Sequence, residues 1–217
     1  MRTVGLVSWE PGTGQNTVAV NLAIGLARQA KSVIILNLNR SMRIYEWLCD
    51  NAGKADLSFN HIYSSSLGVD FIYPEPGQAF VMKKPDYDYV ILNIGGEEFC
   101  KLGMPHCDLI IACTRLKSPD ECKQLLELQL KVKKFRQDER GLDLILPMQV
   151  HSGEWKINSQ RLFELAEVFG DEIIADFLPH CERIHDLFIQ RQSVWQIPQP
   201  AIIDAFDRML ERIEEFN

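Results

Sequence analysis

Residues 1–39 read MRTVGLVSWEPGTGQNTVAVNLAIGLARQAKSVIILNLN. This stretch opens on a short apolar run, passes through a glycine-containing loop at 9–17, and continues into a segment with helical spacing of apolar residues. On that segment Val18, Leu22 and Leu26 share one face, which predicts a helix over 15–30 that packs on a sheet. A strand, a glycine loop and a helix in this order form an arrangement whose backbone N–H groups can bind phosphate.

The rest of the chain alternates short apolar runs, bounded by turn signals, with segments of helical period. Such alternation is typical of a parallel sheet that is covered on both faces. Strands are predicted at 3–8, 32–38, 69–72, 89–94, 109–114, 142–148 and 173–177. Further helices are predicted at 118–136, where Ser118, Pro119 and Glu121 form a start signal, and at 201–216. We therefore expect an α/β fold of three layers, with a mainly parallel sheet of about seven strands and helices on both faces.

Composition and charge narrow the classes of function. The 217 residues contain no linker rich in serine, glycine and proline, which predicts one domain over 1–217. A net charge of −7 argues against whole-surface contact with nucleic acid or anionic lipid. The six cysteines include no CxxC pair, and no histidine has a ligand at metal-site spacing, so no metal site is expected. The N-terminus lacks a leader pattern and no stretch is apolar enough to span a bilayer, which predicts a cytoplasmic protein without direct membrane insertion.

Four stretches in order resemble the ParA/MinD family of deviant Walker P-loop ATPases, of the SIMIBI class. They are the opening at 1–39, YDYVILNI at 87–94, CDLIIACT at 107–114, and the segment at 178–194 that begins LPH and ends QSV. The family's loop reads KGGxGKT, its second strand ends in a DxD-like motif, and its Walker B strand reads YDYVIID. The resemblance implies a P-loop NTPase-like fold whose phosphate loop comprises Gly12, Thr13, Gly14, Gln15, Asn16 and Thr17.

At six positions this chain departs from the motifs that the resemblance implies. Gln15 stands at the P-loop lysine, and Asn16 stands at the hydroxyl residue that binds Mg²⁺. Glu10 stands at the signature lysine, which in the family reaches across a nucleotide-sandwich dimer. The acidic pair after the second strand is replaced by Asn37 and Asn39, and the Walker B aspartate by Asn93. The loop is a degenerate Walker A motif.

These replacements remove the charges that such a site uses. Losing the bonds of two lysines should cost on the order of 1.5–3 kcal/mol each, or roughly 10² to 10⁴ in affinity. Without a carboxylate or hydroxyl for Mg²⁺, the transition state loses its main stabiliser. We therefore expect a pseudo-ATPase with no catalytic residue and no cofactor. Two alternatives stay open: weak binding of ATP or ADP, aided by Thr17, and ordinary polar residues at strand ends.

The resemblance then implies a non-hydrolysing protein-interaction or localisation module for a bacterial machinery of the pilus, secretion, envelope-polymer or partition type. The face that carries Glu10, Gly12, Gln15, Asn37 and Asn93 would dimerise without nucleotide or bind a protein partner.

The first alternative function is a weak or partner-activated ATPase. The second is a DNA-partition protein that uses the basic cluster of Lys131, Lys133, Lys134 and Arg136. Cations at the end of a helix also complement its dipole, so the sequence disfavours a nucleic-acid partner. The last helix carries five carboxylates against two arginines, and it is expected to pack on the domain or on a protein rather than on lipid.

Overall fold

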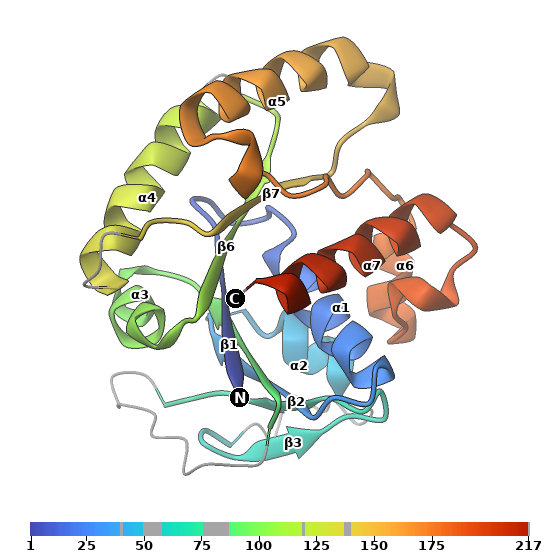
Figure 1. The fold of residues 1–217 in the computed structure, drawn as a ribbon. Coiled ribbons are helices and arrows are strands. Elements are labelled where there is room, and N and C mark those ends of the chain that lie inside the picture. Colours follow the sequence, from blue (N-terminus) through green and yellow to red (C-terminus); the bar gives the residue numbers. More distant parts are fainter. Residues whose placement is uncertain (40, 50–57, 76–86, 119, 137–139, 217) are drawn as a thin grey trace.

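A seven-stranded sheet runs through the molecule in the order β3-β4-β2-β5-β1-β6-β7 (Figure 1). The computed structural model describes residues 1–39, 41–49, 58–75, 87–118, 120–136 and 140–216. The strands are β1 (Arg2–Val7), β2 (Val33–Leu38), β3 (Ile62–Ser64), β4 (Asp70–Ile72), β5 (Tyr89–Ile94), β6 (Leu109–Arg115) and β7 (Leu144–Met148). All neighbouring strands pair in parallel except β3, which is antiparallel to β4.

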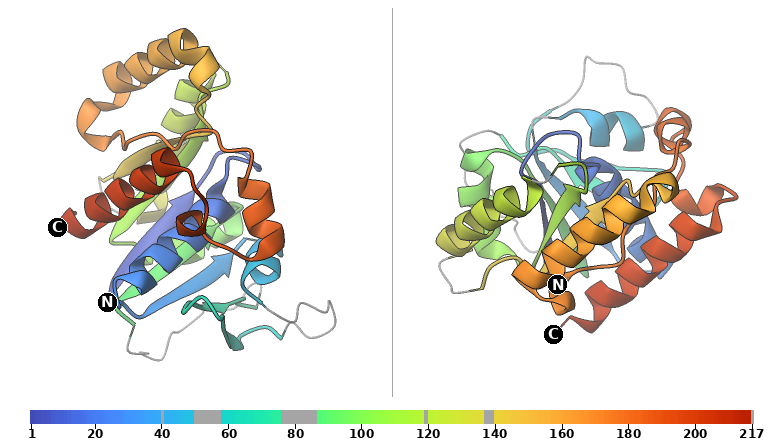
Figure 2. Two further views of the ribbon diagram at one scale, coloured as in Figure 1. Left: turned by 90° about the vertical axis from the view of Figure 1, so that its right-hand side faces the viewer. Right: turned by 90° about the horizontal axis from the view of Figure 1, so that it is seen from above.

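Helices cover both faces of the sheet (Figure 2), which confirms the predicted α/β architecture of three layers. One face carries α1 (Gln15–Arg28), α2 (Arg43–Leu48), α6 (Ile184–Gln190) and α7 (Pro200–Glu215). The other carries α3 (Glu97–Gly103), α4 (Glu121–Arg136) and α5 (Trp155–Phe169). Short 3₁₀ turns lie at Met104–His106, Ser152–Glu154, Asp171–Ile173 and Val194–Gln196.

The strand register places the candidate residues side by side. Leu6 on β1 and Asn37 on β2 both pair with Asn93 on β5. Parallel strands present their carboxyl ends at one edge of a sheet, so the loop after β1 lies beside the polar ends of β2 and β5.

Two strand predictions differ from the structure. The predicted strand at 173–177 is wrong, because its alignment with β7 yields only an isolated bridge between Ile145 and Ile174. Pro147 on β7 has no N–H to donate to this segment, which interrupts the ladder. The sequence also failed to predict β3, whose residues are half-exposed or exposed and carry no continuous apolar run.

The start of α4 and the packing of the last helix agree with the predictions from the sequence. The carboxylate of Glu121 accepts a hydrogen bond from the Ser118 N–H (3.1 Å), as a capping-box glutamate does, while Pro119 lies outside the described residues. Helix α7 buries Ile202, Phe206 and Leu210 in the core beside α1, so the acidic last helix packs on its own domain.

Candidate functional site

The loop between β1 and α1 keeps the backbone form that a phosphate loop needs. Gly14 precedes α1 with a φ of 98°, in the left-handed region that favours glycine. A Cβ added to it would lie 2.7 Å from Met148 Cε, so another residue would also displace that side chain. The Thr13 hydroxyl is buried and has no hydrogen-bond partner among the described residues. Gly14 therefore gives the loop a left-handed turn directly before α1.

Gln15 turns its side chain into the sheet. Its amide nitrogen lies 2.9 Å from the carbonyl oxygens of Leu6 and Ile94 and 2.8 Å from Asn93 Oδ1. The Ser8 hydroxyl donates to the Gln15 amide oxygen at 2.8 Å. Because these acceptors are all on the protein, Gln15 ties the start of α1 to β1 and β5 and leaves no donor for a ligand.

Asn93 is the centre of the buried amide network, which comprises Gln15, Asn16, Asn37 and Asn93. The Asn93 amide nitrogen donates to Asn37 Oδ1 at 2.6 Å and to Asn16 Oδ1 at 2.8 Å. The Asn37 amide nitrogen donates to the carbonyl oxygens of Asn39 and Ser41, each at 2.9 Å. Asn93 is fully buried and Asn37 is 3% exposed. Each amide of the network is thus used by another protein group, and the network is neutral.

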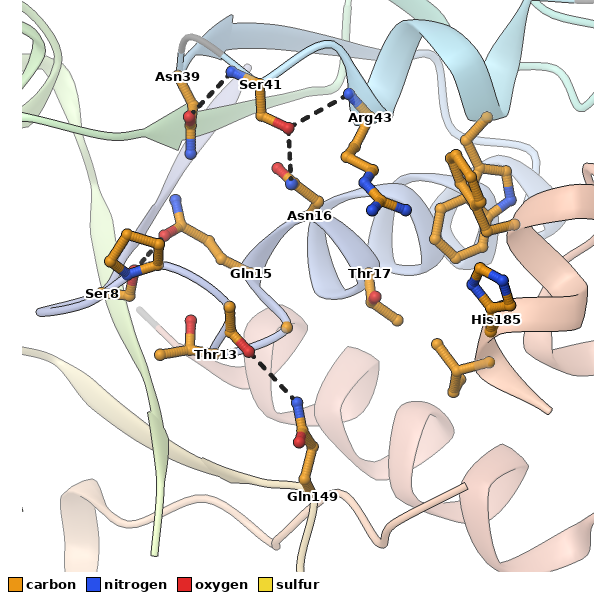
Figure 3. Close-up of a pocket in the computed structure, with 16 residues that line it drawn as sticks. Ser8, Thr13, Gln15, Asn16, Thr17, Asn39, Ser41, Arg43, Gln149 and His185 are labelled. Carbon is orange, nitrogen blue, oxygen red and sulfur yellow. Dashed lines mark hydrogen bonds between the residues drawn. The ribbon is translucent and has the colours of Figure 1, made fainter. Parts of the chain in front are cut away.

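The loop after β2 extends this arrangement at its rim. Asn16 donates to the Ser41 hydroxyl at 3.2 Å, and the Asn39 amide oxygen accepts from the Ser41 N–H at 3.1 Å (Figure 3). The Tyr73 hydroxyl donates to the Ser41 carbonyl oxygen, and burial raises the pKa of this tyrosine. Asn39 and Ser41 are therefore held by uncharged hydrogen bonds.

The donor set does not fit Mg²⁺. The metal prefers carboxylate, hydroxyl and water oxygens in an octahedral shell. At this site the amide oxygens of Asn16, Asn37 and Asn93 already accept hydrogen bonds inside the network. No carboxylate is among the described residues that line the pocket, so nothing here would neutralise a dication.

Glu10 is held within its own chain. Its carboxylate lies 2.9 Å from Arg115 Nη2, at the end of β6. A carboxylate at this position would repel a triphosphate, and the arginine offsets that repulsion in part. The same pair holds the residue at the signature-lysine position against its own β6.

A pocket of about 470 Å³ opens above the loop, and it contains two ionisable side chains that sequence reasoning missed. Arg43 at the start of α2 and His185 on α6 line it together with Gly12, Asn16 and Thr17 (Figure 3). The Arg43 guanidinium also lies 4.8 Å from the ring centre of Phe188. Proximity to the end of β2 could have suggested Arg43, whereas His185 lies far away in the sequence.

The basic cluster is not a continuous surface. Arg136 is buried and pairs with Asp143, whose carboxylate lies 2.5 Å from it. Lys131 lies over the ring of Trp9, 4.3 Å from the ring centre. Lys131, Lys133 and Lys134 are exposed on α4, so the surface lacks only the buried Arg136 of this cluster, which weakens the case for a DNA surface there.

Two further observations concern metals and membranes. Within the described ranges, no three histidine, cysteine or acidic residues gather as metal ligands would. Among the helices of the same ranges, none has the length and apolar character needed to cross a bilayer.

Comparisons with known proteins agree on the fold. No protein-family model matches the sequence, and no curated protein matches it. The apo structure of McdA from Cyanothece has a TM-score of 0.82 at 14% identity, covering 98% of this chain and 99% of that one. MinD from Pyrococcus horikoshii OT3, complexed with Mg-ADP, has a TM-score of 0.78 at 17% identity and covers 99% and 96%. A putative plasmid partition protein from Borrelia burgdorferi B31, bound to AMPPNP, has a TM-score of 0.76 at 12% identity and covers 99% and 98%.

These structures match nearly the whole of this chain, at an identity that speaks for the fold alone. The chain therefore has the fold of the ParA/MinD-type P-loop ATPases.

Proposed function

We propose that this chain is a non-hydrolysing ParA/MinD-like protein that acts by binding other proteins and positioning a cellular machinery. The observation that carries the proposal is the buried amide network. It fills the positions of the Walker lysine, the Mg²⁺ hydroxyl and the Walker B aspartate with neutral groups that bond to one another.

The energetics support a scaffold rather than a damaged enzyme. A buried polar group without a partner costs about 1–3 kcal/mol, so a random loss of the ionic residues would leave costly orphans. In this chain the amides of Gln15, Asn37 and Asn93 are all partnered. Under the proposal, these hydrogen bonds hold the shape of the pocket in place of a nucleotide.

Similar proteins of this fold act with partners. MinD of Aquifex aeolicus, with a TM-score of 0.77 and 12% identity to this chain, has a structure in complex with MinC. For this chain we propose a nucleotide-independent interface on the face that carries Glu10, Gly12 and the amide network. Under the proposal, this interface binds either a second copy of the chain or a different protein.

Mass measurement in solution tests the proposal. Light scattering coupled to gel filtration should give one mass for the chain, identical with and without Mg-ATP, and no phosphate should be released. A Pro11→Arg variant, at an exposed position that lines the pocket, should lose partner binding, while Lys133→Glu on α4 serves as the control on a different surface. Dimerisation only in the presence of Mg-ATP would refute the nucleotide-independent interface.

The alternative of weak nucleotide binding is favoured by one observation. Arg43 brings a cation to a pocket whose described lining holds no carboxylate. Under this alternative, ATP would bind without a metal and Arg43→Ala would abolish binding. A thermal-shift titration with ATP in EDTA distinguishes the two. The alternative predicts a rise in the melting temperature of the parent chain that Arg43→Ala abolishes, whereas the proposed function predicts no shift for the parent chain or for the variant.

A further inference from the structure

The segment that follows α5 leaves an open edge beside β7. The Ala175 N–H donates to the Ile145 carbonyl at 2.9 Å and the Leu178 N–H donates to the Pro147 carbonyl at 2.8 Å. Three residues of the segment thus span two residues of β7, a bulge that leaves the Asp176 and Phe177 N–H groups outside this pairing. Within the part of the chain that the structure describes, neither the Asp176 nor the Phe177 N–H has a partner.

An unpaired edge of this kind is a template for another strand. Here it is neither capped by a charged lysine nor covered by a helix, because α5 and α7 lie on opposite sides of the segment (Figure 1). The two helices leave a pocket on each face of the edge.

The two pockets differ in character. The pocket on the α5 side has about 400 Å³ and is lined mostly by apolar residues, among them Leu162, Phe163 and Phe177, together with Asp171 and Asp176. Phe163 is 63% exposed, so its ring is open to solvent at this pocket. The pocket on the α7 side has about 110 Å³ and holds Arg208 and Arg212. One face of the edge is thus mainly apolar, and the other carries two arginines beside the single carboxylate of Asp176.

We propose that this edge binds an extended segment of a partner protein as an added strand, with apolar and acidic side chains alternating along it. Consecutive side chains of a strand point to opposite faces, so one set would enter the apolar pocket and the next would meet the arginines. The inference rests on the proposed protein-binding function and gives it a second surface, remote from the phosphate loop.

The existing ion pair on the cationic side is suited to exchange. Arg208 lies 2.6 Å from Asp176, and both side chains are more than half exposed, so the pair contributes little to stability. An incoming carboxylate can replace Asp176 as the partner of Arg208. Arg212, whose guanidinium donates to the Glu172 carbonyl, stands beside it on the same pocket.

A second copy of this chain fits the edge less well. An isologous pairing of two identical edges would bring each copy's Arg208 and Arg212 toward the same pair of the other copy. Like charges opposed across an interface disfavour it. A partner that supplies carboxylates meets no such cost.

A synthetic peptide tests the edge directly. The probe is a fluorescein-labelled heptapeptide that alternates valine and aspartate, and its control has the same composition arranged as a valine block and an aspartate block. A slip of one residue moves every side chain of a strand to its other face, so the alternating peptide can always place valines on one face and aspartates on the other. The block peptide has both residue types on each face and cannot do this in any register. We expect the alternating peptide to bind and to protect the Asp176 and Phe177 amides from hydrogen exchange.

Two variants and a matched control locate the site. Phe163→Ser and Arg208→Glu should each weaken binding by about tenfold or more. Leu130→Ser, at an α4 position that is 67% exposed, should leave binding unchanged. All three positions are exposed, so each variant should keep the parent circular dichroism spectrum and unfolding midpoint.

Absence of binding by the alternating peptide, equal binding by the block peptide, or unprotected Asp176 and Phe177 amides would overturn the inference. These outcomes leave the proposed function standing as long as Mg-ATP remains without effect. Binding of Mg-ATP would refute the proposed function whatever the peptide does.

Discussion

Asn93 is the residue through which the amide network is connected. Its amide nitrogen donates to two amide oxygens, which are those of Asn16 and Asn37. A carboxylate of the same shape has no donor and would oppose both oxygens. The hydrogen bonds among Asn16, Asn37 and Asn93 therefore depend on all three side chains being amides.

The first prediction concerns Asn93→Asp. We expect this change to lower the free energy of unfolding by about 1–3 kcal/mol at neutral pH, because two buried acceptors lose their donor. The loss should shrink on acidification, since a protonated carboxyl again offers one donor. Urea unfolding at several pH values measures it.

Asn39→Asp is the matched control for that change. Asn39 uses its side-chain oxygen to accept the Ser41 N–H, and a carboxylate accepts equally well. Its effect should stay within about 0.5 kcal/mol. An equal loss in both variants would mean that general charge repulsion, and not the network, determines the stability.

The sequence predicted where the charged residues were missing but not how their replacements interact. Strand ends and the resemblance located Asn37 and Asn93, since both follow from apolar runs. The direction of the Gln15 side chain depends on the carbonyls of Leu6 and Ile94, which only the paired strands bring together. Arg43 and His185 were missed for the same reason, because α2 and α6 meet only in the folded chain.

At the scale of elements, α4 is anchored at its carboxyl end by a buried ion pair. Arg136 lies against Asp143, and the Asp143 carboxylate also accepts the Ile110 N–H at 2.7 Å. The pair joins the helix to β6 and to the start of β7. This ion pair explains why Arg136, which the sequence groups with a basic surface cluster, lies inside the molecule.

The second prediction is that Arg136→Met destabilises the fold by about 3–5 kcal/mol, because it leaves the Asp143 carboxylate buried without its cation. Equilibrium unfolding in urea gives this value. Lys133→Met, three positions earlier and exposed, should change the free energy of unfolding by less than about 0.5 kcal/mol. A small effect of Arg136→Met would show that water reaches Asp143.

The loop after β7 and the open edge meet at two stacked histidines. The ring centres of His151 and His180 are 3.8 Å apart. The two backbone segments that carry them are joined by the isolated β-bridge between Val150 and Pro179. Desolvation, and secondly the neighbouring His151, lower the pKa of His180. The folded state therefore favours the neutral ring.

The third prediction follows from this direction. The contribution of His180 to the free energy of unfolding should be complete above the ordinary histidine pKa of about 6.5. It should be lost as the pH falls through the lowered pKa of the folded state, because the unfolded chain binds the proton more readily. Unfolding midpoints at pH 7.5 and 5.5 measure the difference. The His151→Asn variant should show a smaller pH dependence, and an unchanged dependence would contradict the role of the stacked pair.

For the whole molecule, periodicity and turn signals predicted the class of fold and six of its strands. The apolar runs of β1, β2, β5 and β6 are buried on both faces, which makes them visible in the sequence. The segment at 173–177 has a similar apolar character, yet its pairing is limited by Pro147 on the neighbouring strand. A sequence pattern reports burial, whereas the ladder depends on which backbone groups the neighbour offers.

The central claim is that a phosphate-loop fold here holds a neutral network in place of a magnesium nucleotide. Isothermal titration of the whole chain with Mg-ATP tests it most directly. The account predicts no saturable heat up to about 1 mM nucleotide, which corresponds to a binding free energy weaker than about −4 kcal/mol. A saturable isotherm with a micromolar dissociation constant, lost when Gly14 is replaced, would contradict it.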